Sequence, residues 1–169
     1  MPTAEYKPSC SIWRRRHDGG CGYHHHEDRS DTLAGESVRR DDERVDVMTK
    51  PVRVLIVDDQ ESYRSAARLV VEVTEGFEIA GEAASGEEAL VCVPELQPDL
   101  VLMDIKMPGI DGLETTKRLV ANDPDLQIVV LSTYEAAEYE HTALNAGAVA
   151  FISKSEFGPD SLEAVWEPA

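Results

Sequence analysis

The sequence contains no apolar run of about eighteen residues, the length that a membrane-spanning helix needs. Its first residues also lack the apolar stretch of a secretory signal. Cysteine is scarce: the chain has three in 169 residues, an odd count at spacings that indicate no disulfide framework. Cys92 falls within a helical apolar pattern and is predicted to be a small core residue. Together these absences predict a reduced, cytoplasmic protein without membrane contact.

Positive charge is scarce from Pro51 onward, where seven basic residues stand against twenty-three acidic ones. The first fifty residues are nearly neutral, so almost all of the formal net charge of −17 belongs to the later part. A segment this acidic should repel nucleic acid, and we expect no direct nucleic acid binding by this chain. It suits divalent cations or a partner with a basic face, although most of the acidity is expected simply to keep the protein soluble.

Apolar residues are sparse and follow no period in residues 1–50, so no core can offset the entropy of ordering this segment. We expect a disordered or dispensable extension there, followed by one domain over residues 51–169. Residues 48–51 directly precede the first predicted strand and would make an ordinary start of a compact domain, so deletion of residues 1–47 should not lower the melting temperature sharply. The alternative is a metal site, although the spacing of its ligands matches no zinc pattern (Cys10, His17, Cys21 and the histidines at 24–26).

From Val52 onward, strand and helix patterns alternate. Short apolar or β-branched runs predict strands at 52–57, 77–81, 100–103, 127–131 and 148–153. Helical spacing, turn residues and a capping box formed by Ser85 and Glu88 predict helices between them and a last helix at about 159–166. Strict alternation predicts an α/β fold: a flavodoxin-like, doubly wound, five-stranded parallel sheet of order 2-1-3-4-5 with helices on both faces.

Polar residues stand at the ends of four of the predicted strands. Asp58 and Asp59 end the first strand and Asp104 ends the third, and these strands are neighbours in the order 2-1-3-4-5. Ser132 and Lys154 end the fourth and fifth strands. Each residue alone has an ordinary explanation as a cap, a turn residue or a solvated lysine. Their joint occurrence at one edge of the sheet predicts a single polar crevice.

The crevice would bring three carboxylates together, which must share protons or recruit a cation. Oxygen ligands suit Mg²⁺, which is usually held by one or two carboxylates and phosphate oxygens. Lys154 offers a positive charge and Ser132 a hydroxyl, and both suit the oxygens of a transferring phosphoryl group. Asp104 then has a role as the nucleophile that forms an acyl phosphate.

Residues 52 to about 166 resemble the receiver domain of bacterial two-component response regulators. The resemblance rests on the runs V-L-I-V-D-D at 54–59, M-D-I-K-M-P-G at 103–109, V-L-S-T at 130–133, A-G-A at 146–148 and F-I-S-K at 151–154. It is especially similar to NarL/LuxR-type receivers through residues 77–83 and 86–90. Lys154 is followed by Ser155 in place of the proline of many receivers, so a cis peptide bond is not expected there.

The resemblance implies a role for each crevice residue. Asp104 would be the phosphoacceptor, and its phosphoryl donor would be a sensor histidine kinase or a phosphotransfer protein. Mg²⁺ would be held by Asp59, Asp104 and the backbone carbonyl of Lys106, with Asp58 acting largely through water. Lys154 would pair with the phosphoryl group. Ser132 and Phe151 would form the switch, in which the aromatic ring turns inward as the hydroxyl moves to the phosphoryl group.

Three functional hypotheses follow. The first is a stand-alone receiver, not an enzyme, that signals to a downstream protein through a surface around residues 134–154 and forms a homodimer on phosphorylation. The second is a truncated response regulator transcription factor that lacks its helix-turn-helix DNA-binding domain. The third, a Mg²⁺-dependent phosphatase, is disfavoured because position 106 is a lysine where that chemistry needs a second aspartate. Lys106 and Tyr134 flank the crevice and are expected to control water access to the phosphoryl group.

Overall fold

The computed structural model of the chain describes residues 50–133 and 136–166. The predictions for residues 1–49 and for Tyr134 lie outside the described residues. Strands and helices alternate along the rest: β1 (Val52–Val57), α1 (Glu61–Val73), β2 (Phe77–Ala83), α2 (Gly86–Leu96), β3 (Leu100–Asp104), α3 (Gly112–Asn122), β4 (Gln127–Ser132), α4 (Ala136–Asn145), β5 (Ala150–Ser153) and α5 (Pro159–Val165). The five strands are parallel in the order β2-β1-β3-β4-β5, which confirms the predicted fold class.

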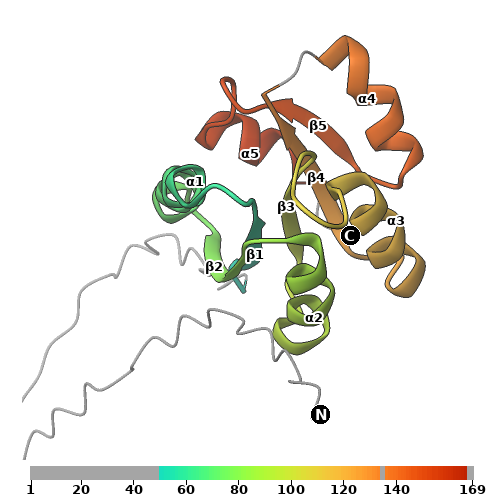
Figure 1. Cartoon of the computed structure of the whole chain (residues 1–169). Coiled ribbons are helices and arrows are strands. Elements are labelled where there is room, and N and C mark those ends of the chain that lie inside the picture. The colour runs from blue at the N-terminus through green and yellow to red at the C-terminus, as the bar shows by residue number, and fades with distance from the viewer. Residues whose placement is uncertain (1–49, 134–135, 167–169) are drawn as a thin grey trace, which may run out of the picture. The chain divides into compact units, whose positions relative to one another are not determined.

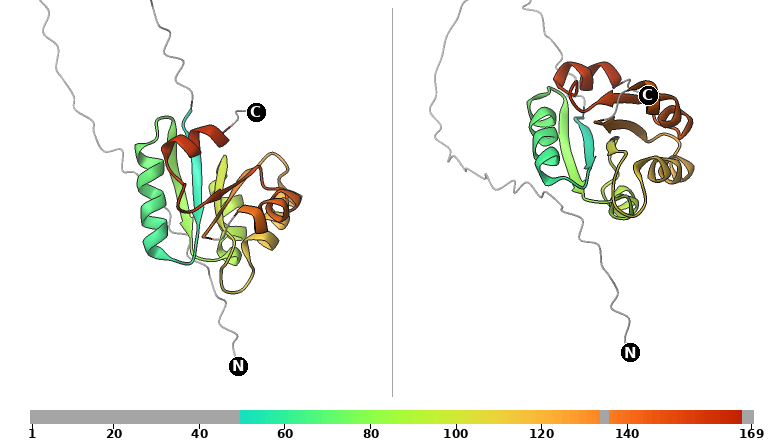
Figure 2. Two further views of the ribbon diagram at one scale, coloured as in Figure 1. Left: turned by 90° about the horizontal axis from the view of Figure 1, so that it is seen from above. Right: turned by 45° about the horizontal axis from the view of Figure 1, so that its top comes forward.

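The sheet is covered by helices on both faces (Figure 1). Helices α1 and α5 pack on one face, and α2, α3 and α4 pack on the other. The left view in Figure 2 shows the strands as a layer between these two groups of helices. Because the central strands are covered on both sides, each of them carries a run of four buried apolar residues (54–57, 100–103 and 128–131), as is typical of parallel sheets. Four consecutive apolar residues in β3 illustrate this, since all of them are completely buried.

Successive residues of each central strand belong to different cores, because side chains alternate across a sheet. The core under α1 and α5 takes Val54 and Ile56 from β1 together with Leu162 of α5. The core under α2 and α3 takes Leu55 and Val57 from the same strand. This alternation fixes the register of the strands and hence which residues lie at their carboxyl ends.

Several element boundaries differ from the sequence prediction. Strand β2 continues to Ala83, two residues beyond its predicted end, with an irregularity in its pairing opposite Val54 and Leu55. Helix α2 ends at Leu96 and includes Pro94 near its end, as its sequence suggests. Its last carbonyl groups accept hydrogen bonds from the guanidinium of Arg53, which compensates for the missing partners at this end. Tertiary contacts of this kind cannot be predicted from the periodicity of apolar residues.

The predicted capping box at α2 is present in a modified form. The Ser85 hydroxyl accepts a hydrogen bond of 3.1 Å from the backbone N–H of Glu88, as predicted. The Glu88 carboxylate accepts its bond, 2.7 Å, from the N–H of Ala84 and not from that of Ser85. Two amino-terminal donors are satisfied in either case, so α2 begins where the pattern predicts.

Cys92 is fully buried in the core under α2 and α3, which confirms its assignment as a core residue. Of the helices within residues 50–133 and 136–166, α1 is the longest with 13 residues. None of these helices has the length and apolarity that a membrane crossing requires.

Candidate functional site

The carboxyl ends of four strands bring the predicted crevice residues to one edge of the sheet. Val57 of β1 pairs with Met103 of β3, so the residues that follow them, Asp58 and Asp104, stand side by side. Ser132 is the last residue of β4, and its backbone carbonyl accepts a hydrogen bond of 2.7 Å from the N–H of Lys154, which follows β5. The fold thus assembles residues that are up to 96 positions apart in the sequence.

Three carboxylates form the floor and rim of this crevice, which we call the acidic notch (Asp58, Asp59 and Asp104, together with the ammonium group of Lys154). One oxygen from each of these aspartates lies within 4.8 Å of the others. Asp58 and Asp104 are only 1% and 5% exposed, whereas Asp59 is exposed to solvent. The notch therefore combines two buried carboxylates with one that solvent reaches.

The Lys154 side chain closes the inner wall of the notch. Its ammonium nitrogen lies 2.9 Å from Asp104 Oδ1 and also forms an ion pair with Asp58 Oδ2. The side chain is 6% exposed, so this cation is held inside the protein between two buried carboxylates. It also lies over the face of Tyr63, 4.2 Å from the ring centroid. Buried charges need such partners, because an unpaired one is costly.

Negative charge is in excess in the notch, since three carboxylates face one ammonium group. Burial raises the pKa of Asp104 above the ordinary aspartate value; Lys154 lowers that pKa in part, and the charges of Asp58 and Asp59 raise it further. Burial and the charges of Asp58 and Asp104 likewise raise the pKa of Tyr63, so that hydroxyl stays protonated. An excess of negative charge in a partly buried space favours a bound cation.

Backbone contacts hold the two strand ends in place. The N–H of Gln60 donates a 2.8 Å hydrogen bond to Asp58 Oδ1, and Arg64 of α1 donates one of 2.7 Å to the Asp58 carbonyl. Gly112, at the start of α3, packs against the backbone of Asp104: a Cβ at this position would lie 1.9 Å from the Asp104 carbonyl oxygen. A glycine is therefore required for α3 to begin so close to the site.

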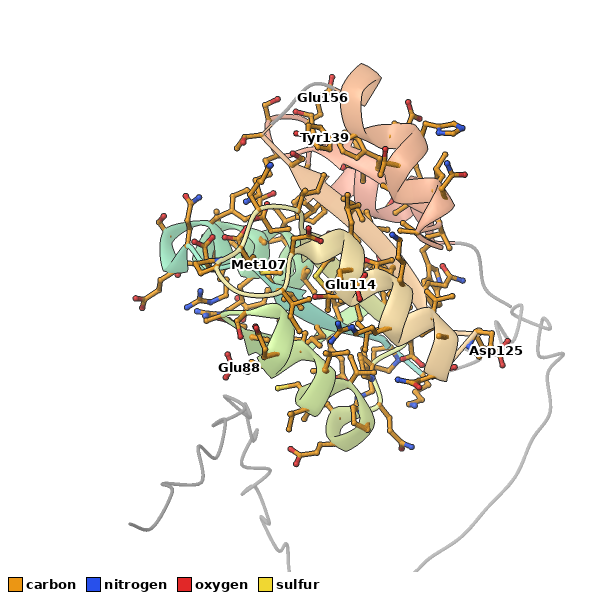
Figure 3. All side chains as sticks on the ribbon, turned by 45° about the vertical axis from the view of Figure 1, so that its right-hand side comes forward. Glu88, Met107, Glu114, Asp125, Tyr139 and Glu156 are labelled. Carbon is orange, nitrogen blue, oxygen red and sulfur yellow. The ribbon has the colours of Figure 1, made fainter. Side chains whose placement is uncertain are left out.

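The loop between β3 and α3 carries Lys106 and is fastened from α2. The N–H of Ile110 donates a 3.0 Å hydrogen bond to the Glu87 carboxylate. The bond from Glu87's own backbone N–H, and then this one, lower the pKa of Glu87. Gly109 adopts φ +82°, the left-handed region that glycine tolerates best. Met107, labelled in this loop in Figure 3, is buried and anchors the loop to the core under α2 and α3.

The predicted switch residues lie on the adjacent strands β4 and β5, with Phe151 two residues before Ser153, the residue that pairs with Ser132. Ser132 is buried at the end of β4. Phe151, opposite Val130 in the β4–β5 pair, packs half-buried against a small cluster beneath α4 that includes Tyr139. Tyr139 points from α4 toward this end of the sheet (Figure 3), and the ammonium of the exposed Lys106 lies 5.7 Å from its ring centroid.

Three residues near the notch were missed by the sequence analysis: Tyr63, Arg64 and Glu87. Tyr63 and Arg64 lie in the first turn of α1, directly after the paired aspartates, and that position was the only available signal. Glu87 was seen only as part of a helix start, because its bond to Ile110 spans 23 residues. All peptide bonds in the described part of the chain are trans, including the one after Lys154, as expected.

A family model described as the response regulator receiver domain matches residues 54–166. The chain therefore belongs to the response regulator receiver domain family. It is 38% identical over 114 residues to response regulator GacA of Pseudomonas viridiflava, an alignment that covers 68% of this chain and 53% of that protein. The chain thus spans about half the length of this curated relative.

Solved structures agree with this assignment. The response regulator domain of Thermotoga maritima CheB is 30% identical with a TM-score of 0.61, covering 70% of this chain and 99% of that one. A LuxR family two-component response regulator from Aurantimonas sp. SI85-9A1 is 29% identical with a TM-score of 0.63, and the match covers 68% of this chain and 81% of that one. The domain is accordingly a signalling module of the two-component type, a family in which phosphorylation and Mg²⁺ at an acidic pocket are typical and which is generally not enzymatic.

Proposed function

We propose that the protein is a phosphorylation-dependent signalling switch that accepts a phosphoryl group on Asp104. The observation that carries this proposal is the placement of the Lys154 ammonium 2.9 Å from Asp104 Oδ1 inside the acidic notch. This lysine can follow an anionic group attached to Asp104, while Asp58 and Asp59 remain as carboxylate ligands. A carboxylate that only capped a turn would not be buried beside a cation and two further carboxylates.

The transfer itself is a simple displacement. A carboxylate oxygen of Asp104 attacks the phosphorus of the donor, an oxygen–phosphorus bond forms, and the bond from phosphorus to the donor breaks. The leaving group keeps the electron pair of that bond and takes up a proton from solvent. When the donor is a phosphohistidine, the leaving group is the imidazole. The negative charge of the three phosphoryl oxygens then needs cations, and Lys154 supplies one of them.

The donor set of the notch fits Mg²⁺. Three carboxylate oxygens within 4.8 Å of one another are hard ligands of the kind that Mg²⁺ prefers, and solvent, which reaches Asp59, can supply its waters. We assign Asp59, Asp104 and the backbone carbonyl of Lys106 as its ligands, with Asp58 contributing through water. Bound there, the ion would neutralise charge that builds up on the phosphoryl oxygens. Glu87 contributes by holding the loop that carries the Lys106 carbonyl.

The signal leaves the site through Ser132 and Phe151. Phosphorylation adds charge next to Ser132, whose hydroxyl moves to a phosphoryl oxygen, and the Phe151 ring turns into the space that it leaves. Phe151 packs with Tyr139 under α4, so this rotation changes the surface formed by α4 and β5. That surface is where we place the downstream protein target and a homodimer contact. Lys106, exposed at the rim, remains predicted to control water access to the phosphoryl group.

Residues 51–169 carry this function as a receiver domain, and residues 1–50 are proposed to be a dispensable extension. A sensor histidine kinase or phosphotransfer protein supplies the phosphoryl group, which places the protein in the cytoplasm.

Incubation of the full chain with acetyl phosphate and Mg²⁺, followed by intact mass measurement, tests the proposal. We expect one phosphoryl adduct on the wild type and none on Asp104→Asn. Asp111→Asn is the matched control, because Asp111 caps α3 a few residues away and its carboxylate bonds only the N–H of Glu114. An adduct that persists on Asp104→Asn, or a wild type that accepts none, overturns the proposal.

A second candidate is a transcription factor of which this chain is the receiver part. The observation in its favour is that the chain spans about half of GacA, and that two-component relatives of the LuxR family are among the similar structures. The acidity of residues 51–169 means that any DNA contact would come from another segment. The genomic reading frame beyond position 169 separates the two candidates: a helix-turn-helix domain there supports the second.

A further inference from the structure

We infer that Tyr63 is a positioning residue for Lys154: its aromatic face holds the ammonium group so that it points at Asp104. The inference rests on the proposed function and adds a residue to the machinery that carries it. Tyr63 lies in the first turn of α1, and its ring centroid is 4.2 Å from Lys154 Nζ. That distance is well inside the range of about 6 Å over which a cation is attracted to an aromatic ring.

The surroundings make this contact stronger than a surface one. The Lys154 side chain is almost completely buried, so its ammonium group has lost most of its water. A desolvated cation gains most from the electron-rich face of a ring, because no solvent competes with that face. Asp58 and Asp104 bind the same ammonium group, so the ring completes a three-sided cage around it. The four-carbon lysine stem is flexible, and the cage restricts where its end can lie.

Tyr63 is itself well fixed relative to the site. Its backbone N–H donates a 3.0 Å hydrogen bond to the carbonyl of Gln60, whose own N–H is bonded to Asp58. The next residue, Arg64, bonds the carbonyl of Asp58 and the carboxylate of Glu82. The start of α1 is therefore tied to the strand end that carries Asp58, and the ring moves with the notch.

The aromatic ring of Tyr63, and not its hydroxyl group, makes the contact that positions Lys154. The Tyr63 hydroxyl oxygen is buried and has no hydrogen-bond partner among the residues that the structure describes. A buried hydroxyl without a partner is unfavourable, so it gives no reason to prefer tyrosine to phenylalanine. When Lys154 turns from Asp58 toward a phosphoryl group on Asp104, the ring still lies beneath the ammonium and guides it. The proposal therefore predicts that phenylalanine replaces Tyr63 and leucine does not.

The geometry is tested by NMR on the full, unphosphorylated chain labelled at its five lysines. Protons over an aromatic face are shifted upfield by the ring current. The ε-methylene signal of Lys154 should therefore lie further upfield than those of the other four lysines, including Lys106, which is 5.7 Å from the Tyr139 centroid. Tyr63→Phe should keep this displacement and Tyr63→Leu should remove it. Tyr139→Leu is the matched control, since that ring faces Lys106 and not Lys154. An undisplaced Lys154 signal in the wild type overturns the inference without any variant.

A kinetic experiment tests the functional consequence: it measures the rate at which the phosphoryl adduct forms from acetyl phosphate at saturating Mg²⁺. We expect Tyr63→Leu to slow it about tenfold and Tyr63→Phe to match the wild type within about twofold. A Tyr63→Leu variant as fast as the wild type, or a Tyr63→Phe variant as slow as Tyr63→Leu, overturns the inference while the proposed function stands. If the wild type forms no adduct, the proposed function fails. Should Tyr63→Leu not fold, the NMR displacement in the wild type and in Tyr63→Phe still decides the geometry.

Discussion

The acidic notch touches a second cluster of charged residues that is built quite differently. In this arginine cluster, Arg64 and Arg68 of α1 both pair with Glu82 of β2, at 3.3 Å from Arg64 Nε and 2.6 Å from Arg68 Nε. The notch has three carboxylates for one ammonium group, whereas the arginine cluster has two guanidinium groups for one carboxylate. Both arginine side chains are partly exposed to solvent. The two meet where Arg64 bonds the Asp58 carbonyl.

The comparison shows how the burial of surplus charge separates a functional site from a structural one. The arginine cluster joins α1 to the edge of the sheet, and each charge in it has a partner. The notch keeps carboxylates in excess and buried, an arrangement that costs stability unless a cation or proton is taken up. If this interpretation is correct, the same kind of substitution should have opposite consequences in the two clusters.

The largest effect on stability is expected for Lys154→Met. This change leaves Asp58 and Asp104 buried without their cation, and we expect a loss of about 3–5 kcal/mol in the free energy of unfolding without metal. Mg²⁺ should restore part of the loss, so its stabilising effect should be larger in the variant than in the wild type. Urea unfolding with and without Mg²⁺ measures both, with Lys117→Met, exposed on α3, as the control. A variant as stable as the wild type without Mg²⁺ contradicts the account.

Glu82→Ala breaks the arginine cluster and leaves two partly buried guanidinium groups unpaired. We expect a loss of about 1–3 kcal/mol in the free energy of unfolding, with phosphorylation retained in the folded protein. Glu78→Ala on the same strand is the matched control, because its pair with Arg53 is longer, at 3.8 Å, and more exposed. The comparison fails if Glu82→Ala abolishes the phosphoryl adduct while the protein remains folded.

Asp104→Asn should make the protein more stable at neutral pH. Because burial raises the pKa of Asp104, the folded state binds the proton more tightly than the unfolded state. Stability from this group therefore falls as pH rises from the ordinary aspartate value, 3.8, through the folded pKa, and stays low above it. Asparagine at position 104 cannot ionise and so removes this loss. We expect the free energy of unfolding to rise by about 0.5–2 kcal/mol at neutral pH, and this gain to disappear below the ordinary aspartate pKa.

Urea midpoints measured across that pH range check this prediction, with Asp125→Asn in an exposed turn as the control. A gain that is independent of pH points to packing and not to the charge of Asp104. A loss of stability at neutral pH contradicts the claim that the notch holds negative charge in excess.

The smallest effect is expected for Arg118→Ala. Arg118 and Glu114 form an ion pair of 2.9 Å along the exposed surface of α3, with about half of each side chain in solvent. Such pairs contribute less than about 0.5 kcal/mol, so the unfolding midpoint should hardly move. A loss comparable to that of Glu82→Ala would show that balance and burial do not explain the difference between the clusters.

Much of the fold could be predicted from the sequence, because periodicity reports which face of each element is buried. The predicted strand order alone places Asp58, Asp104 and Lys154 at one edge of the sheet. Contacts that depend on long-range geometry could not be predicted. Arg53 of β1, for example, donates hydrogen bonds to the Leu96 and Gln97 carbonyls at the end of α2.

The site was predicted as a set of residues but not as an arrangement. From the sequence, Lys154 is predicted to contact the phosphoryl group. In the structure its ammonium group forms ion pairs with both Asp58 and Asp104. Tyr63 was missed because nothing in its helical spacing distinguishes a ring under a cation from a ring in the core. Its packing against the core beneath α1 would have been expected from periodicity alone.

The central claim is that one carboxylate in the notch, that of Asp104, carries the phosphoryl group. Borohydride reduction of the phosphorylated full chain tests this most directly, because it converts an aspartyl phosphate to homoserine, which peptide mass spectrometry then locates. We predict homoserine at position 104 and nowhere else, and only after treatment with acetyl phosphate and Mg²⁺. Homoserine at position 58 or 59, or none in a chain that carries the adduct, would contradict the account.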